Sequence, residues 1–159
     1  EHGLPVLLAG DGIGLWQATH RHDVGRLFAY AAGNPKTYGQ AFNATRDHVF
    51  TWRDYYREAA QALGTTAQVV LAPAGWVTAQ NPKRFSFLDE ITRYHGAYSS
   101  QKAKATVPEF RAEIGFEQGA RETILDMKKR GVWRRHRDDA EYSALVTRAL
   151  QLGFEQLTA

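Results

Sequence analysis

The sequence predicts an α/β protein of one domain without disulfides, and each of these three features rests on one observation. Short apolar runs that end at glycine or proline alternate with longer amphipathic segments, which is typical of strands and helices in alternation. At 159 residues the chain is long enough to bury a core, and we expect one domain over residues 1–159. The chain has no cysteine, which excludes disulfide frameworks and thiolate chemistry.

The first expected strand, residues 5–9, ends in a turn with three glycines at alternate positions from Gly10. This turn resembles a dinucleotide-binding loop. That loop needs its third glycine at the sixth position, where this chain has Leu15, and a helix directly afterwards. Residues 16–22 instead predict a short extended run. We therefore expect no cofactor at this turn.

A helix is expected next, over residues 23–32. Asp23 is its predicted N-cap, because a carboxylate there can accept a backbone N–H of the first turn. Gly33 provides the C-terminal stop and Pro35 lies just beyond it. Residues 39–45 predict a second strand.

Thr51 and Asp54 have the spacing of a capping box, in which each side chain accepts the other residue's backbone N–H. They predict a helix over residues 52–63 that stops at Gly64. A third strand is expected at residues 67–72, ended by a proline.

The second half of the chain is less regular. Residues 75–98 predict helix fragments and loops, because aromatic residues and turn formers are mixed there. A helix is expected over residues 116–130. Asp138 or Asp139 is predicted to cap a final amphipathic helix that ends near residue 152.

The net charge is +3, and much of the positive excess lies in residues 128–137, around Trp133. Such a cluster can attract phosphates, but it is more often a solvated helix end. No apolar run reaches the roughly twenty residues of a membrane span. We predict a cytoplasmic protein without a membrane partner.

Two further patterns are interpreted as structural. His20, His22 and Asp23 would suit a metal site, but Asp23 already has a capping role and no further ligands converge, so we predict no metal. Tyr98 and Lys102 have the Tyr-x-x-x-Lys spacing of a general acid–base pair. Without a phosphate-binding loop before it, this spacing is interpreted as chance.

An ordered set of short motifs runs through most of the chain. The motifs are Gly10-Asp11-Gly12, His20-x-x-Asp23-Val24, Gly39-Gln40-Ala41-Phe42-Asn43, Thr51-Trp52, Ala62-Leu63-Gly64, Lys102-Ala103-Lys104, Glu117-Gln118-Gly119 and Arg121-Glu122-Thr123. Together they resemble the C-terminal half of the extended short-chain dehydrogenase/reductase family, and more narrowly NAD-dependent epimerase/dehydratase proteins.

The resemblance implies a C-terminal fragment of a Rossmann-type enzyme. It would consist of one late sheet strand, residues 40–45, and a small α/β lobe that binds a small-molecule substrate. The N-terminal half, with the cofactor loop and the catalytic Ser, Tyr and Lys, would be absent. The intact parent would bind NAD or NADP, whereas this chain alone would bind neither and carry no catalytic residue. The start at Glu1, without a methionine, fits a piece of a longer protein.

Five residues are predicted to contact the substrate. Trp16 and Gln17 lie where nucleotide-sugar members of the family carry an arginine, and His20 matches a family position before the helix. Tyr94 could line a pocket, and Arg84 could meet an anionic group.

The alternative function is a non-enzymatic module. In that case residues 128–137 would bind nucleic acid or mediate oligomerisation. Sheet edges left unpaired by the missing half could also pair two copies of the chain into a homodimer.

Overall fold

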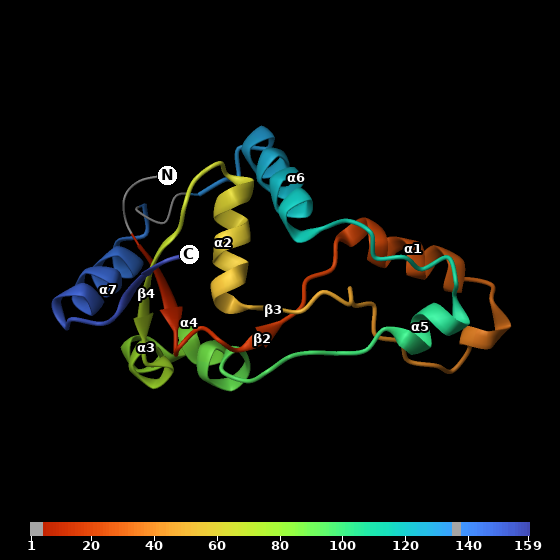
Figure 1. Cartoon of the computed structure of the whole chain (residues 1–159), viewed down its shortest axis with the longest axis horizontal. Coiled ribbons are helices and arrows are strands. Elements are labelled where there is room, and N and C mark those ends of the chain that lie inside the picture. Colours follow the sequence, from red (N-terminus) through yellow and green to blue (C-terminus); the bar gives the residue numbers. More distant parts are fainter. Residues whose placement is uncertain (1–4, 135–137) are drawn as a thin grey trace.

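The computed structural model describes residues 5–134 and 138–159 and confirms the α/β class (Figure 1). A three-stranded sheet has the order β1 (Val6–Ala9), β4 (Gln68–Ala72), β5 (Gln156–Thr158). β1 and β4 run parallel, with Leu7 opposite Val70, and β5 pairs antiparallel to β4. The expected strands at residues 5–9 and 67–72 are thus present and adjacent. β5 forms one edge of the sheet, and the sequence did not predict this strand.

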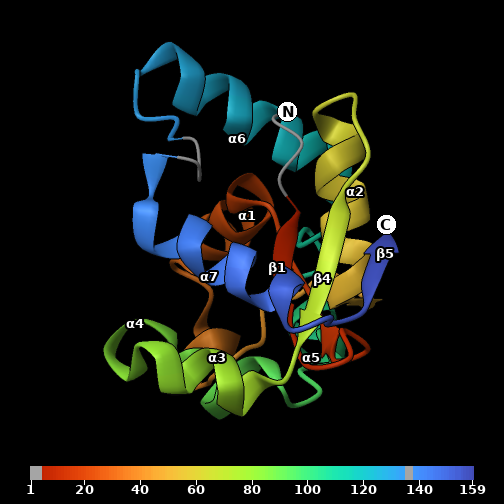
Figure 2. The ribbon, with the colours of Figure 1, turned by 90° about the vertical axis from the view of Figure 1, so that its left-hand side faces the viewer.

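Helices cover both faces of this sheet (Figure 2). Alternate strand residues face opposite sides, as the pleat requires. Leu7 and Val70 pack toward α3 (Ala74–Gln80), α4 (Pro82–Phe87) and α7 (Ala140–Gln151). Their neighbours along the strands pack on the other face against α2 (Trp52–Ala62) and form a second cluster. The main core is therefore a helix–sheet–helix sandwich.

Two short strands, β2 (Leu15–Trp16) and β3 (Phe50–Thr51), form a separate antiparallel pair. The glycine-rich turn before β2 packs against the start of α2. Gly12 has a φ of +72°, and a Cβ on it would lie 2.5 Å from Leu8 Cδ2, so only glycine fits. The carbonyl of Gly12 accepts the N–H of Arg53, at the first turn of α2. This bond fixes the turn against the start of α2.

A second, smaller core lies at the other end of the molecule (Figure 1). There α1 (Arg21–Ala31) and α5 (Gln101–Thr106) pack through Leu27, Ala103 and Phe110, all of them buried. α5 falls in a region for which the sequence predicted no helix. This core shares no buried residue with the two clusters on the sheet.

The strand predicted at residues 39–45, and with it the late strand at 40–45, is wrong. After the 3₁₀ turn η1 (Pro35–Thr37) the described chain there is irregular. It lies beside the segment before α5, but Asn43 and Thr45 donate their side-chain hydrogen bonds to backbone carbonyls of that segment. Because these contacts use side chains, the backbone of residues 39–45 forms no strand ladder with the neighbouring segment.

The predicted N-cap Asp23 is also wrong. α1 begins at Arg21, and His20 is the N-cap: its Nδ1 accepts the backbone N–H of His22 at 3.4 Å. Asp23 is buried, and its carboxylate accepts the N–H of Ile114, 91 positions along the chain. A buried carboxylate needs a hydrogen-bond donor, and this tertiary demand overrides the local capping preference of aspartate.

The remaining helices follow the sequence closely. α6 (Phe116–Lys129) occupies the predicted range, and Asp139 caps α7 by accepting the N–H of Tyr142. Residues 75–98 contain α3, α4 and a π-helical turn, η2 (Leu88–Thr92). Within the described residues, no helix has the length and apolar character to cross a membrane.

Candidate functional site

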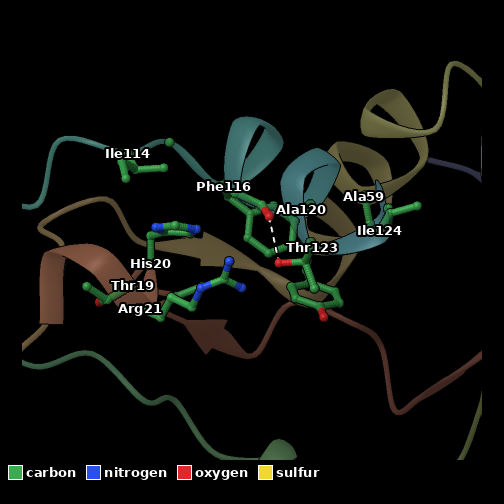
Figure 3. Close-up of a pocket in the computed structure, with 13 residues that line it drawn as sticks. Thr19, His20, Arg21, Ala59, Ile114, Phe116, Ala120, Thr123 and Ile124 are labelled. Atoms are coloured by element: carbon green, nitrogen blue, oxygen red, sulfur yellow. Dashed lines mark hydrogen bonds between the residues drawn. The ribbon is translucent and has the colours of Figure 1, made fainter. Parts of the chain in front are cut away.

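A cavity of about 370 Å³ lies where the start of α1, the middle of α2 and the start of α6 meet (Figure 3). Its walls are mostly apolar, with a few polar groups among them. The lining residues are Ala18, Thr19, His20, Arg21, Tyr55, Ala59, Ile114, Gly115, Phe116, Gly119, Ala120, Thr123 and Ile124. This combination is typical of small-molecule sites, in which apolar walls provide affinity and a few polar groups fix orientation.

His20 is the most constrained polar residue of the cavity. Its ring packs directly on α6 at Gly119, where an added Cβ would lie only 2.9 Å from His20 Cδ2. Only 6% of the His20 side chain is exposed, and its Nε2 makes no hydrogen bond in the described part of the chain. The carboxylate of Glu122 lies 3.4 Å from that nitrogen. His20 is therefore held rigidly, with one nitrogen available for a partner.

Aromatic rings form one wall. The ring centroid of Phe116 lies 4.8 Å from Tyr55 and 5.3 Å from Phe50. Burial raises the pKa of the Tyr55 phenol, so its hydroxyl remains a neutral hydrogen-bond donor at physiological pH. The same cavity receives Arg21, whose side chain is exposed at its rim. The site thus offers donors of both neutral and cationic type next to an apolar surface.

Of the five predicted substrate residues, His20 lines this cavity. Trp16 stacks on Trp52 of α2, with ring centroids 4.9 Å apart. The amide of Gln17 donates to the carbonyls of Arg46 and Tyr98 and accepts the N–H of Tyr98, so it cross-links two segments of chain. These two residues therefore hold β2 in place and lie outside the cavity wall.

Arg84 and Tyr94 lie elsewhere. Arg84, on α4, forms ion pairs with Asp139 and Glu141 at α7. The hydrogen bonds that its guanidinium donates to Asp139 and, second, to Glu141 raise the pKa of Arg84 further, and they tie the two helices together. Tyr94 follows η2 and is exposed, with the Arg93 guanidinium over its ring. The structure does not bring the five predicted residues into one site.

The other sequence patterns have structural partners. Lys102 donates to the Gln40 side chain at 2.8 Å and lies over the Phe42 ring. In the basic segment, Arg130 pairs with Asp126 and Lys128 lies over Trp133. Residues 135–137 of that segment lie outside the described residues.

Sequence reasoning missed the α6 side of the cavity, above all Phe116 and Gly119, and the neighbouring Glu122 beside His20. One signal was available. A glycine inside an otherwise good helix costs about 1 kcal/mol relative to alanine, so Gly119 indicates a close approach by another group. Which group approaches could not be inferred, because His20 is 99 positions away and its proximity depends on how α1 and α6 are placed.

One curated protein shows similarity to this chain. Over 113 residues the chain is 27% identical to 2′-dehydrokanamycin reductase from Streptomyces kanamyceticus. The match takes in 71% of this chain but only 32% of that reductase, so the chain spans about a third of the relative's length. No family model and no solved structure matches the chain. The similarity links the matched part of this chain to about a third of a reductase.

Proposed function

We propose that this chain is the substrate-binding portion of an NAD(P)-dependent reductase related to the epimerase/dehydratase proteins. The observation that carries the proposal is the cavity between α1, α2 and α6, in a chain whose relative is a reductase. In that relative about two-thirds of the protein lies outside the matched region. We place the nicotinamide cofactor and the catalytic groups in such additional sequence.

The cavity's chemistry supports a small polar carbonyl compound as the substrate. The relative is named for reducing 2′-dehydrokanamycin, an oxo compound, and we propose the same substrate class here. Apolar contact would come from Phe116 and Ala120, while Tyr55 and Arg21 would donate hydrogen bonds to oxygen. His20 would help to fix the orientation of the substrate. No proton or hydride transfer is assigned to these residues, because their proposed role is binding.

A binding experiment on the chain itself tests this. Saturation-transfer NMR with a panel of oxo sugars is expected to show contact with the wild-type chain. The Ala120→Phe variant fills the cavity and should lose that contact. Gln118→Phe adds the same ring to the exposed side of the same helix and should retain it. Equal contact in both variants would show that the compounds bind outside the cavity.

Calorimetric titration with NADH and NADPH tests whether the cofactor-binding groups lie outside this chain. The chain alone is expected to bind neither, because the glycine-rich turn lacks the third glycine of a dinucleotide-binding loop and is followed by β2 in place of a helix. Micromolar binding of either cofactor would contradict the proposal.

Salt-dependent binding of single-stranded RNA in place of oxo sugars would favour the alternative, a nucleic-acid module that uses residues 128–137. A concentration-dependent dimer held through β1 or β5 would favour the oligomerisation alternative.

A further inference from the structure

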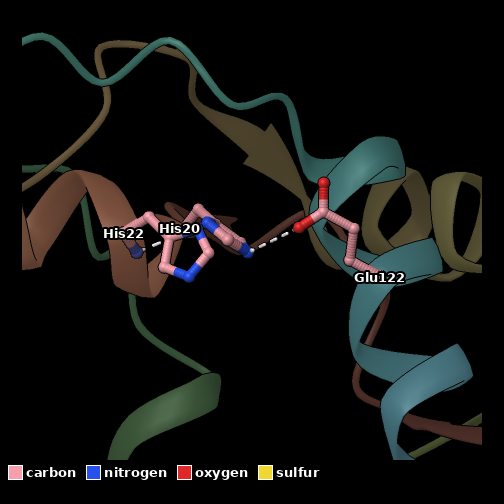
Figure 4. Close-up of side chains that lie close together, drawn as sticks. All are labelled: His20, His22 and Glu122. Atoms are coloured by element: carbon pink, nitrogen blue, oxygen red, sulfur yellow. Dashed lines mark hydrogen bonds and ion pairs between the residues drawn. The ribbon is translucent and has the colours of Figure 1, made fainter.

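His20, His22 and Glu122 bring three metal-ligating groups together at one edge of the cavity (Figure 4). The two histidines lie at the start of α1 and the glutamate lies in the middle of α6. Each residue offers one ligand atom, and all three atoms lie within 4.8 Å of one another. We propose that these residues form a binding site for a divalent transition metal, with Zn²⁺ as the reference ion.

The ligand set fits this class of ion. Imidazole nitrogen suits zinc, nickel, cobalt and copper, and two histidines with one glutamate are a known type of zinc site that leaves a fourth position open. Ligand atoms around a tetrahedral zinc lie about 3.3 Å apart, given bonds of about 2.0–2.1 Å. His20 Nε2 and Glu122 Oε2 already lie 3.4 Å apart. Two of the three ligands therefore have the required spacing.

A second observation is independent of this spacing. His20 Nε2 is fully buried and has no hydrogen-bond partner among the described residues. Such an atom is costly in a folded protein unless something binds it, and the 3.4 Å contact with Glu122 is an ion pair only when the histidine is protonated. It faces Glu122, whose other carboxylate oxygen is already occupied by the Gln118 side chain at 3.0 Å. A metal ion would satisfy the His20 nitrogen and use the remaining Glu122 oxygen.

The third ligand can close the site with little rearrangement. His22 is exposed, and its ring lies edge-on to that of His20 with centroids 4.8 Å apart. A side-chain rotation therefore moves it without disturbing the core. When His20 binds metal through Nε2, its proton resides on Nδ1, and the 3.4 Å bond from the His22 N–H is given up. That bond is at the long limit, so the loss is small.

The site is distinct from the function proposed above, because it needs only groups of this chain. Its location nevertheless connects it to the cavity. His20 also lines the cavity, so a bound ion would lie at the cavity wall. Three protein ligands leave one position for water or for an oxygen of a bound molecule. The single negative charge of Glu122 offsets part of the ion's charge.

Titration of the whole 159-residue chain with Zn²⁺, and with Co²⁺ for its visible absorption, tests the proposal. We expect one strong site with the spectrum of tetrahedral Co²⁺. His22→Ala and Glu122→Gln each remove a ligand from an exposed or half-buried side chain, so both should fold, and each should weaken binding by at least about tenfold. Far-ultraviolet circular dichroism checks that both variants remain folded.

The chain provides a matched control. His48 faces Glu58 with 3.7 Å between Nε2 and Oε1, but no third ligand joins this pair among the described residues. His48→Ala should therefore leave the affinity and the cobalt spectrum unchanged. Absence of a strong site, or equal binding by wild type, His22→Ala and Glu122→Gln, would overturn the proposal. Loss of binding in His48→Ala alone would overturn it as well.

Discussion

At the scale of single residues, Gly119 determines how closely α1 and α6 approach at the cavity. The His20 ring occupies the space in which any side chain at this position would lie. Asp23 has a comparable role one turn further along α1, where its buried carboxylate satisfies the N–H of Ile114. These contacts join the start of α1 to the segment that leads into α6. The cavity exists because that junction is fixed.

Gly119→Ala is expected to destabilise the fold. Alanine favours a helix, but here its Cβ would lie 2.9 Å from a ring atom of the buried His20, and overpacking of this kind costs about 1–3 kcal/mol. Gly25→Ala is the matched control: Gly25 also lies inside a helix, and a Cβ added to it would meet no atom within 4 Å. We expect it to stabilise the protein by about 0.5–1 kcal/mol. Urea unfolding of both variants measures the contrast, and stabilisation by Gly119→Ala would contradict the close contact.

At the scale of elements, α2 is the helix on which the site is built. It begins with the complete capping box that the sequence predicted, in which Thr51 and Asp54 each accept the other's backbone N–H. It then provides Tyr55 and Ala59 to the cavity and packs its opposite side on the sheet. Its start also receives the glycine-rich turn through Arg53. One helix thus connects the sheet, the turn and the cavity.

Thr51→Ala should cost about 1 kcal/mol of stability, because it leaves a first-turn N–H of α2 without its acceptor. Thr51→Ser retains the hydroxyl and is expected to recover most of the loss. Thermal unfolding followed by circular dichroism at neutral pH is the measurement. A cost as large for serine as for alanine would mean that the hydroxyl is not the important group.

The same cap predicts a dependence on pH. Burial raises the pKa of Asp54, but hydrogen bonds from Thr51 and the ion pair with Arg57 outweigh it, so the net pKa is lowered on folding. A lowered folded-state pKa gives stability that is present above the unfolded value, about 3.9, and lost as the pH falls through the folded value. Wild type should therefore lose more stability than Asp54→Asn between neutral pH and pH of about 3. Parallel losses in the two proteins would contradict this role for Asp54.

At the scale of the whole molecule, residues 5–134 and 138–159 form two separate apolar centres. The sheet and its helices form one, and the α1–α5 pair forms the other around Phe110 (Figure 1). The segment from β2 to α1 and the segment that leads into α6 connect them, and the cavity lies at this connection. Cooperative units in proteins often coincide with such separate packing clusters. The two centres should therefore differ in their response to mutation.

Phe110→Ala is expected to remove about 3–5 kcal/mol from the α1–α5 centre, because the ring is almost fully buried. Hydrogen exchange should then accelerate in α1 and α5 while amides of β1 and β4 keep their protection. Val146→Ala, a buried change in the sheet core, is the control and should accelerate exchange in the sheet. Equal acceleration in both centres for Phe110→Ala would show that the molecule unfolds as one unit.

The sequence alone predicted the features that depend on neighbours along the chain. Short apolar runs that end at glycine or proline indicated β1 and β4, and local hydrogen-bonding chemistry indicated the Thr51–Asp54 cap. It also indicated a cap at Asp138 or Asp139, and the structure has Asp139 in that place. Of the extended run predicted at residues 16–22 only the start is confirmed, since β2 covers Leu15–Trp16 and α1 begins at Arg21. These features are local because their energies arise within one or two turns of backbone.

Tertiary structure decided the features that depend on distant partners. The strand expected at residues 39–45 did not form, since a strand requires a neighbour that the sequence pattern cannot locate. The Asp23 carboxylate accepts the N–H of Ile114 and does not cap its own helix. His20 contacts Gly119 and Glu122, which lie about a hundred positions further along the chain. The cavity and the proposed metal ligands therefore appear only when the start of α1 is placed against α6. A short motif determines its own conformation. A site depends on the distances between motifs, and only packing sets those distances.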